Sequence, residues 1–426
     1  MADAAEDASR SEERERRLSQ ALAALRIRRF AAWWGAQFLS GIGSWAQAVA
    51  IPWYVLDRTN SAADVGIVTA LQFLPILLLS LVGGAIADRV SRRALLLGTQ
   101  LGLAALAAIL GLLVLLGRPP LVVVGVVAFG IGVTSALNNP AQQAFLAELV
   151  PGELLPAAVA LNSVRFNAAR MVGGALGGVL IAAFGVATAL WANALSFLPV
   201  VVVLVALRAH TARSAGVPRR SESLLRELGS GLRYVAGETP LLTAVLIFGF
   251  VGLFGFNWQV AVPLVARFVL HQRAVGLGQL LGALGFGALA AALFVTASPR
   301  ATQRRLVVSG LGLAAALVSL GLAPSVLLAA VLLFAGGVFG VLASVSANTL
   351  LQTLSPPALR GRIMALYVLL VAGTTPIGAF LLGELASWLG AGRAVVVFGA
   401  ATGVGILAAV AARYRWHASA APSAAS

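Results

Sequence analysis

The chain contains no cysteine, no lysine and only three histidines among its 426 residues. Without cysteine, no disulfide can hold the fold and no thiol chemistry is available. A phosphate-binding loop and a Schiff base both require lysine, so both are excluded. His210, His271 and His417 fall in expected loops or tails, with no acid at metal-ligand spacing. We therefore expect no enzyme activity, no metal ion and no cofactor.

Charged residues are also scarce, at 11% of the chain, whereas 60% is hydrophobic. In an average globular protein, about 25% of the residues are charged and about 45–50% are hydrophobic. Apolar stretches of about 20 residues, enough to cross a bilayer, can be placed twelve times, whereas a β-barrel would show short alternating strands. The sequence predicts an all-α membrane protein with twelve transmembrane helices. These begin near Phe30, Val65, Ala94, Leu121, Leu155, Val186, Leu241, Val275, Leu306, Pro324, Leu359 and Val395.

The net charge of +15 comes from arginine, and its distribution matters more than its size. With both termini placed in the cytoplasm, most arginines fall in inner loops and tails, as the positive-inside rule requires. The excess therefore reflects membrane topology and not nucleic-acid binding. The arginines expected outside are Arg58, Arg118, Arg267, Arg273 and Arg393.

A polar stretch divides the chain into two halves of six spans. Its leucines recur at helical spacing, which predicts an amphipathic helix over 221–235 on the inner membrane surface. The expected segments are a cytosolic tail over 1–29, a six-helix bundle over 30–208, a cytoplasmic linker over 209–240, a second bundle over 241–413 and a tail over 414–426.

The two halves resemble each other in sequence. Proline and glycine pairs recur at nearly constant offsets, which indicates parallel six-span repeats around a central site. The pairs include Pro52 with Pro263, Gly173 with Gly378, Gly178 with Gly383 and Gly185 with Gly390.

Two arginines fall within the fifth span. An arginine at the centre of a span costs about 2.5–3.5 kcal/mol on insertion scales, so it usually faces a cavity or a partner. Arg170 lies near mid-depth, and Arg165 lies about 7.5 Å closer to the cytoplasm at 1.5 Å per residue. For Arg170 we favour substrate binding or coupling over a structural hydrogen-bond hub. For Arg165 we favour the structural role.

Acidic residues near these arginines are few. Glu148, at the inner end of the fourth span, is expected to form an ion pair with Arg165. Glu384 is the acid we place inside the hydrocarbon, where burial favours its protonated form. It is either a proton carrier or a solvated residue at the outer rim.

Polar side chains form a stripe on the first span and recur in the fourth, seventh and tenth. Hydrogen bonding between helices explains part of this pattern. The remainder indicates an amphiphilic cavity suited to a bulky organic molecule. The candidate cavity residues are Gln37, Ser44, Gln47, Asn138, Gln142, Asn257, Trp258 and Asn348.

Four glycines of the fifth span form two interleaved Gly-x3-Gly pairs, which favour close packing of helix backbones. The alternative is a bendable or sealing contact between the halves. The glycines are Gly173, Gly174, Gly177 and Gly178.

The turn after the second span, over 84–93, resembles the loop signature of the major facilitator superfamily, with Ser91 in place of a glycine. The resemblance extends over 29–413 and implies a rocker-switch cycle. It also implies a cytoplasmic gate in which Asp88 lies against the positive end of the eleventh helix. The gate residues are Gly84, Asp88, Arg89, Arg92, Arg93, Arg360 and Arg362.

Within that superfamily, the stretches over 140–151, 160–163, 167–170 and 359–362 resemble the exporter branch that contains the enterobactin exporter and macrolide efflux proteins. The four glycines resemble an antiporter signature, with Gly174 where proline is usual. This implies a secondary exporter of drugs, macrolides or siderophores in the cytoplasmic membrane, driven by proton antiport.

The expected partners are the substrate, protons and the lipid bilayer, and the expected state is a monomer. The alternatives are a uniporter, an importer or a lysolipid flippase of the same fold. A membrane sensor or scaffold that transports nothing would need neither the polar stripe nor Arg170.

Overall fold

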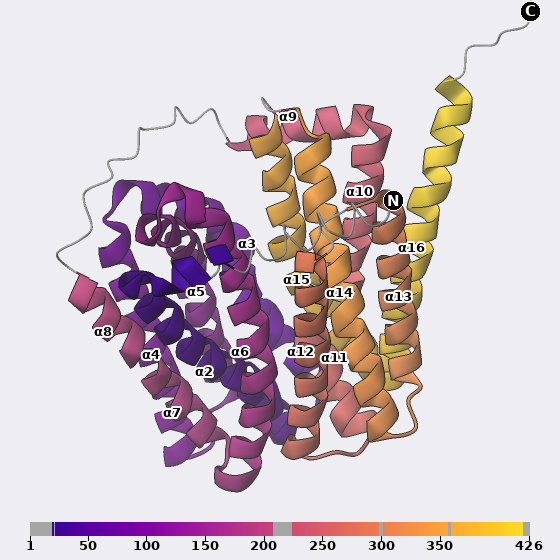
Figure 1. Cartoon of the computed structure of the whole chain (residues 1–426). Helices are drawn as coiled ribbons and strands as arrows, with labels where there is room; N and C mark the ends of the chain where they lie inside the picture. Colours follow the sequence, from indigo (N-terminus) through magenta and orange to yellow (C-terminus); the bar gives the residue numbers. More distant parts are fainter. Residues whose placement is uncertain (1–18, 21, 208–223, 298–300, 357–358, 421–426) are drawn as a thin grey trace, which may run out of the picture.

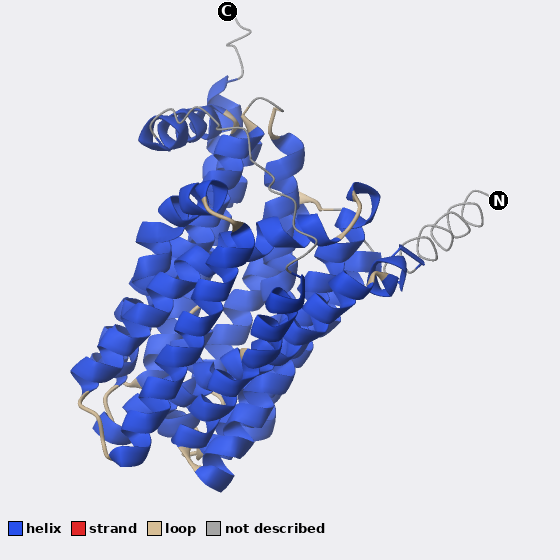
Figure 2. Ribbon diagram, turned by 90° about the vertical axis from the view of Figure 1, so that its left-hand side faces the viewer, coloured by secondary structure: helices blue, strands red, loops and turns tan. Residues whose placement is uncertain are grey.

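A computed structural model describes residues 19–20, 22–207, 224–297, 301–356 and 359–420 of the chain. These residues form helices joined by short turns, without a strand in any of the five ranges (Figure 2). The backbone hydrogen bonds are therefore satisfied within each helix, as a bilayer requires.

The helices fall into two groups that follow the chain order (Figure 1). The first group comprises α2 (Arg28–Thr59), α3 (Ala62–Arg89), α4 (Arg92–Leu116), α5 (Leu121–Leu149), α6 (Leu155–Phe184), α7 (Val186–Ser196) and α8 (Leu198–Ala206), with a short 3-10 turn, η1 (Gly152–Leu154). The second comprises α10 (Thr239–Phe250), η3 (Val251–Gly255), α11 (Trp258–Leu264), η4 (Val265–Val269), α12 (Ala274–Ala297), α13 (Gln303–Gly321), α14 (Val326–Leu354), α15 (Arg360–Leu389) and α16 (Ala391–Ala420).

Eleven helical segments in the described part of the chain are long and apolar enough to cross a membrane. Helix α2 is not among them, although it has 32 residues, because the polar stripe over Gln37–Gln47 lowers its hydropathy. It packs against α6 and α7 and has the length of a span. With α2 counted as the twelfth, the structure agrees with the predicted twelve-helix fold.

Two helix pairs, α3 with α15 and α6 with α12, make most of the contacts between the halves. Glycines bring the backbones together. A Cβ added to Gly66 would lie 2.8 Å from the Cα of Gly383, and one added to Gly178 would lie 2.5 Å from the Cα of Gly278. These contacts lie near the starts of α3 and α12. The halves meet at this end and separate toward the end that carries the linker helix α9 (Leu224–Gly237) (Figure 1).

The seventh span is interrupted, whereas the first span is one continuous helix. A π-helical turn, η3, follows α10, and Phe256 and Asn257 are not helical. The side-chain amide of Asn257 donates to the carbonyl oxygen of Leu253 at 2.7 Å, which satisfies one acceptor at the break. π-Turns often occur at functional sites, and this one places Phe256 and Trp258 beside the first half.

Helix α9 (Leu224–Gly237) lies across one end of the second half and packs on α10 and α15 (Figure 1). Arg362 of α15 donates from Nη1 to the Ser230 hydroxyl at 2.9 Å. Gly231 lies against the backbone of Arg362, with a built Cβ at 3.3 Å. The linker helix is thus attached to the start of α15.

Candidate functional site

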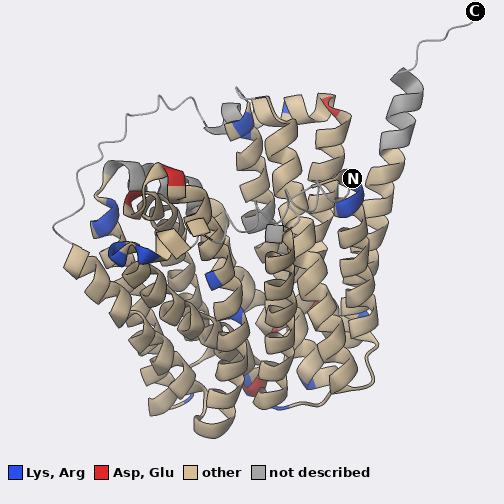
Figure 3. Cartoon of the chain, in the orientation of Figure 1, with Lys and Arg blue, Asp and Glu red and all other residues tan. Residues whose placement is uncertain are grey.

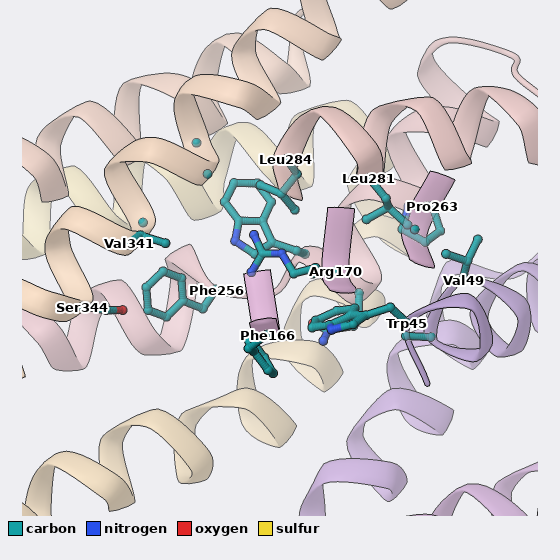
Figure 4. A pocket seen from close by; sticks show the side chains of 17 residues that line it. Trp45, Val49, Phe166, Arg170, Phe256, Pro263, Leu281, Leu284, Val341 and Ser344 are labelled. Carbon is teal, nitrogen blue, oxygen red and sulfur yellow. The ribbon is translucent and has the colours of Figure 1, made fainter. Parts of the chain in front are cut away.

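A cavity of about 270 Å³ lies between the two halves. Its walls come from α2 and α6 on one side and from the interrupted seventh span, α12 and α14 on the other (Figure 4). Aromatic rings and small apolar residues dominate the lining, with Arg170, Gln259 and Ser344 as its polar members. We call this space the central cavity. The aromatic lining comprises Trp45, Phe166, Phe256 and Trp258.

Arg170 is the charged group of the central cavity. Its Cζ lies 5.6 Å from the centroid of the Trp45 ring, within the range of a cation–π contact. Its Nε is buried without a hydrogen-bond partner, and no acid occurs among the described residues that line the cavity. A positive charge therefore remains available to a ligand in this space.

A second space of about 240 Å³ lies inside the first half, enclosed by α2 to α7. We call it the amide pocket, because most of its lining side chains are amides and hydroxyls. Trp45 and Phe166 line both spaces, so the two adjoin. The polar lining comprises Gln37, Ser40, Ser44, Gln47, Gln72, Gln100, Ser135, Asn138, Asn139, Gln142, Arg165 and Asn193.

Hydrogen bonds between helices hold the walls of the amide pocket. The hydroxyl of Thr99 and the amide nitrogen of Gln100 both donate to Oδ1 of Asn138, at 3.0 and 3.3 Å. On the opposite side, Nδ2 of Asn193 donates to Oε1 of Gln47 at 2.9 Å. These bonds join α4 to α5 and α7 to α2, which fixes the shape of the pocket.

Arg165 lines the amide pocket and is bound by neutral oxygen atoms. Its Nη1 donates to the carbonyl oxygen of Gln37 at 2.7 Å, and its Nε donates to Oδ1 of Asn162 at 3.0 Å. The expected ion pair with Glu148 is wrong: Glu148 instead pairs with Arg92 at 2.6 Å. Glu148 lies at the end of α5 beside the first turn of α4, whereas Arg165 is turned toward α2.

The predicted cavity residues are divided between these spaces. Arg170 and Trp258 line the central cavity. Gln37, Ser44, Gln47, Asn138, Gln142 and Arg165 line the amide pocket.

Three predicted residues lie elsewhere. Asn257 is 3% exposed and lines a small crevice with Phe254 and Phe398. The Oδ1 of Asn348 accepts a hydrogen bond from Gln352 at 2.7 Å. Glu384 is half-buried in the last part of α15 and is absent from the lining of both spaces.

Only part of the expected gate can be placed. The surroundings of Gly84 and the side chains of Asp88 and Arg89 lie outside what the structure describes. Ser91 caps α4, since its hydroxyl accepts from the backbone N–H of Ala94 at 3.4 Å. Serine therefore has a capping role where the superfamily signature has glycine.

The arginines near this turn are held by separate partners. Arg93 donates from Nε to the carbonyl oxygen of Leu204 at 2.5 Å, and Arg92 is paired with Glu148. Arg360 is exposed, and Arg362 contacts α9 as described above.

Several lining residues were not predicted from the sequence. Phe166 follows Arg165 in the fifth span, and Phe256 is one of several aromatic residues of the seventh span, so neither stands out in the sequence. Gln72, Gln100 and Asn193 are single amides in apolar spans. An amide in a span needs a polar partner, so each of them could have been predicted to face a polar neighbour.

Comparison with known proteins identifies the family. A family described as "Transmembrane secretion effector" matches residues 19–425. The chain is 30% identical to the multidrug efflux pump Tap of Mycolicibacterium fortuitum over 374 residues, which cover 83% of this chain and 88% of the pump. It is 29% identical to the enterobactin exporter EntS of Shigella flexneri, with 87% of each chain covered. It is 25% identical to the staphyloferrin A transporter of Staphylococcus aureus, with 86% and 91% covered.

Solved structures show the same fold. A POT family transporter in complex with a thioalcohol-conjugated peptide has a TM-score of 0.73 at 13% identity, covering 91% of this chain and 96% of that one. A bacterial homologue of the lysosomal transporter Spinster has a TM-score of 0.65 at 15% identity, covering 91% and 94%.

The family model spans nearly the whole chain, and the matching relatives are exporters of the major facilitator superfamily. Members of this family are multi-pass membrane transporters and not enzymes. This chain therefore belongs to the transmembrane secretion effector family of major facilitator transporters.

Proposed function

We propose that this protein exports bulky organic molecules from the cytoplasm by alternating access, with protons moving inward in exchange. The observation that carries the proposal is the central cavity, whose walls come from both halves. A site built in this way is exposed to either membrane face when the halves rotate. The cavity is complete within one chain, which supports a monomeric transporter.

The arrangement of the halves supports an inward-open state. The arginine-rich loops predict that the end carrying α9 faces the cytoplasm, and the halves separate toward that end (Figures 1 and 3). At the other end, the contacts of Gly66 with Gly383 and of Gly178 with Gly278 close the path. A cytoplasmic substrate would enter between the halves and reach Arg170.

The lining favours particular substrates. Aromatic walls suit planar or bulky apolar groups, and the Arg170 charge favours a neutral or acidic molecule over a cation. The names of the relatives refer to several drugs and to enterobactin and staphyloferrin A, which are organic molecules. A cavity that selects substrates only by their charge and apolar area can accept molecules as different as these.

For proton coupling we propose Glu384 as the carrier. Glu148 is engaged by Arg92 at 2.6 Å, so a proton would have to displace that ion pair. Glu384 has no ion pair among the described residues and is half-buried near the closed end. It can be reached from outside when the far end opens.

Transport into everted membrane vesicles tests the proposal. With a fluorescent acidic amphiphile as the probe, we expect uptake that requires a pH gradient and stops when an uncoupler is added. Glu384→Gln should abolish the dependence on the gradient, whereas Glu148→Gln, the matched control, should retain it. Uptake that continues after the gradient collapses would assign uniport, and absence of uptake would reject export.

A further inference from the structure

Three amides that line the amide pocket align with aromatic residues in the second half. The repeat places Pro52 on Pro263 and Gly185 on Gly390, and this alignment sets amides of the pocket on aromatic residues. The aligned pairs are Gln37 with Phe248, Gln47 with Trp258 and Asn193 with Phe398. The six-helix bundle therefore does not need polar residues at these positions in order to fold.

The second half has packed rings at two of these positions, whereas Trp258 lines the central cavity. Phe248 stacks on Tyr367 with 4.9 Å between ring centroids, and Phe254 meets Phe398 edge-on at 5.2 Å. Burying polar groups costs free energy unless they are hydrogen-bonded. A polar cluster in one half, where apolar packing serves the other, indicates a task beyond folding.

Two residues that line the amide pocket each carry a buried side-chain atom with unmet hydrogen-bonding capacity. The Nε2 of Gln37 and the Oε1 of Gln100 are buried without partners, and the two residues are 4% and 1% exposed. Buried polar groups are nearly always paired in native proteins, so both atoms require explanation. One is a donor and the other an acceptor.

These two atoms indicate the chemistry of a ligand. A hydroxyl group both donates and accepts, whereas a carboxylate only accepts and an ammonium group only donates. Acids are absent from the described lining, which disfavours a cation. Two nitrogens of Arg165 already donate to protein oxygens. Several hydroxyls on one ligand group fit this mixture of amides best.

The position of the pocket indicates how such a group would be presented. Trp45 and Phe166 meet edge to face with 5.6 Å between centroids, and both line the two spaces. A molecule with an apolar body in the central cavity can therefore pass a polar substituent beside these rings. Phe166 is 49% exposed and has room to move.

We propose that the amide pocket is a subsite for a polyhydroxylated substituent, such as a glycosyl group, of a substrate whose aromatic body occupies the central cavity. This assignment rests on the proposed function, because it divides one transported molecule between two adjoining spaces.

Binding of a matched pair of compounds tests the subsite. The probes are 4-methylumbelliferyl glucoside and its aglycone, titrated calorimetrically into the purified full chain. We expect the wild type to bind the glucoside about tenfold more tightly, the effect of pairing one buried hydrogen-bonding group. Gln37→Met combined with Gln100→Met should remove this preference and leave aglycone binding unchanged, which also shows that the variant is folded.

Ser346→Ala is the matched control. Ser346 is 1% exposed and its hydroxyl is also buried without a partner, but it lies outside both spaces. The preference for the glucoside should persist in this variant. Equal binding of the two probes by the wild type, or a preference that survives the double substitution, would overturn the subsite alone. Failure to bind either probe would count against the aromatic central cavity and hence against the proposed function as well.

Discussion

The guanidinium group of Arg170 lies over the indole ring of Trp45, with 5.6 Å between Cζ and the ring centroid. The contact joins α6 to α2 at the wall of the central cavity. The face of an aromatic ring attracts a cation but carries no net charge, so it does not neutralise the cation. The pair therefore holds the guanidinium in place while leaving it able to attract a ligand.

Replacing Arg170 should lower export of acidic substrates. With Arg170→Met, we expect uptake of an acidic amphiphile into everted vesicles to fall by about tenfold or more, because one charge-assisted contact is lost. Uptake of a neutral analogue should change little. Arg267→Met is the matched control, since Arg267 lies 5.9 Å from the Trp53 ring in a pair that does not line the cavity. Equal losses for both analogues would contradict a role in charge selection.

Enlarging Gly178 should open the far end of the transporter. A Cβ there would lie 2.5 Å from the Cα of Gly278 and 2.6 Å from the carbonyl oxygen of Ala274. We expect Gly178→Val to slow export and to raise the labelling of Ala274→Cys by an impermeant maleimide several-fold, because the chain has no other cysteine. Gly98→Val, at a position with open space around it, should change neither quantity. Unchanged labelling in the first variant would remove this contact from the closure.

A methyl group at Gly378 should destabilise the fold. The added Cβ would overlap the backbone carbonyl oxygen of Leu253 and would lie 2.5 Å from Nδ2 of Asn257, beside the break in the seventh span. Overpacking of this kind costs about 1–3 kcal/mol, so thermal unfolding in detergent should begin at a lower temperature for Gly378→Ala. Gly361→Ala serves as the control, because nothing lies within 4 Å of its built Cβ. Equal melting temperatures would show that α15 and the seventh span can shift apart here without loss of stability.

The bond between Asn193 and Gln47 should show coupling in a double-mutant cycle. Asn193→Leu leaves the buried Oε1 of Gln47 without its donor and should cost about 0.6–2 kcal/mol, the range for hydrogen bonds between membrane helices. Adding Gln47→Leu should recover part of the loss, because both polar groups are then absent. Strictly additive effects on the unfolding free energy would mean that the bond contributes nothing.

Much of the global fold follows from the sequence because it depends on composition and periodicity. The scarcity of charge predicts a membrane protein, and the repeated prolines and glycines predict two related halves. The polar stripe of α2 is a regular helical pattern, so its members Gln37, Ser44 and Gln47 do share one pocket. Each of these inferences depends on the residues of a single segment or on the match between corresponding segments of the two halves.

The division of polar residues between the two spaces does not follow in the same way. Arg165 and Arg170 are five residues apart, which is about 140° around a helix at 100° per residue. The spacing shows that they face different directions, but the neighbour that each one faces depends on how α6 packs. Gly173 packs against Ile42 and Trp45 of α2, and Gly174 packs against Leu281 of α12. These contacts set the rotation of α6.

The sequence by itself determined that this chain is a two-fold repeat of membrane helices with arginines and amides in its spans. Only the tertiary structure decided that Glu148 binds Arg92, that Asn257 points away from the central cavity, and that the amides of the first half enclose a pocket. The physical reason is that apolar area and helical period are properties of single segments. The partner of a buried polar group is instead set by the crossing and rotation of whole helices, which glycine contacts far along the chain determine.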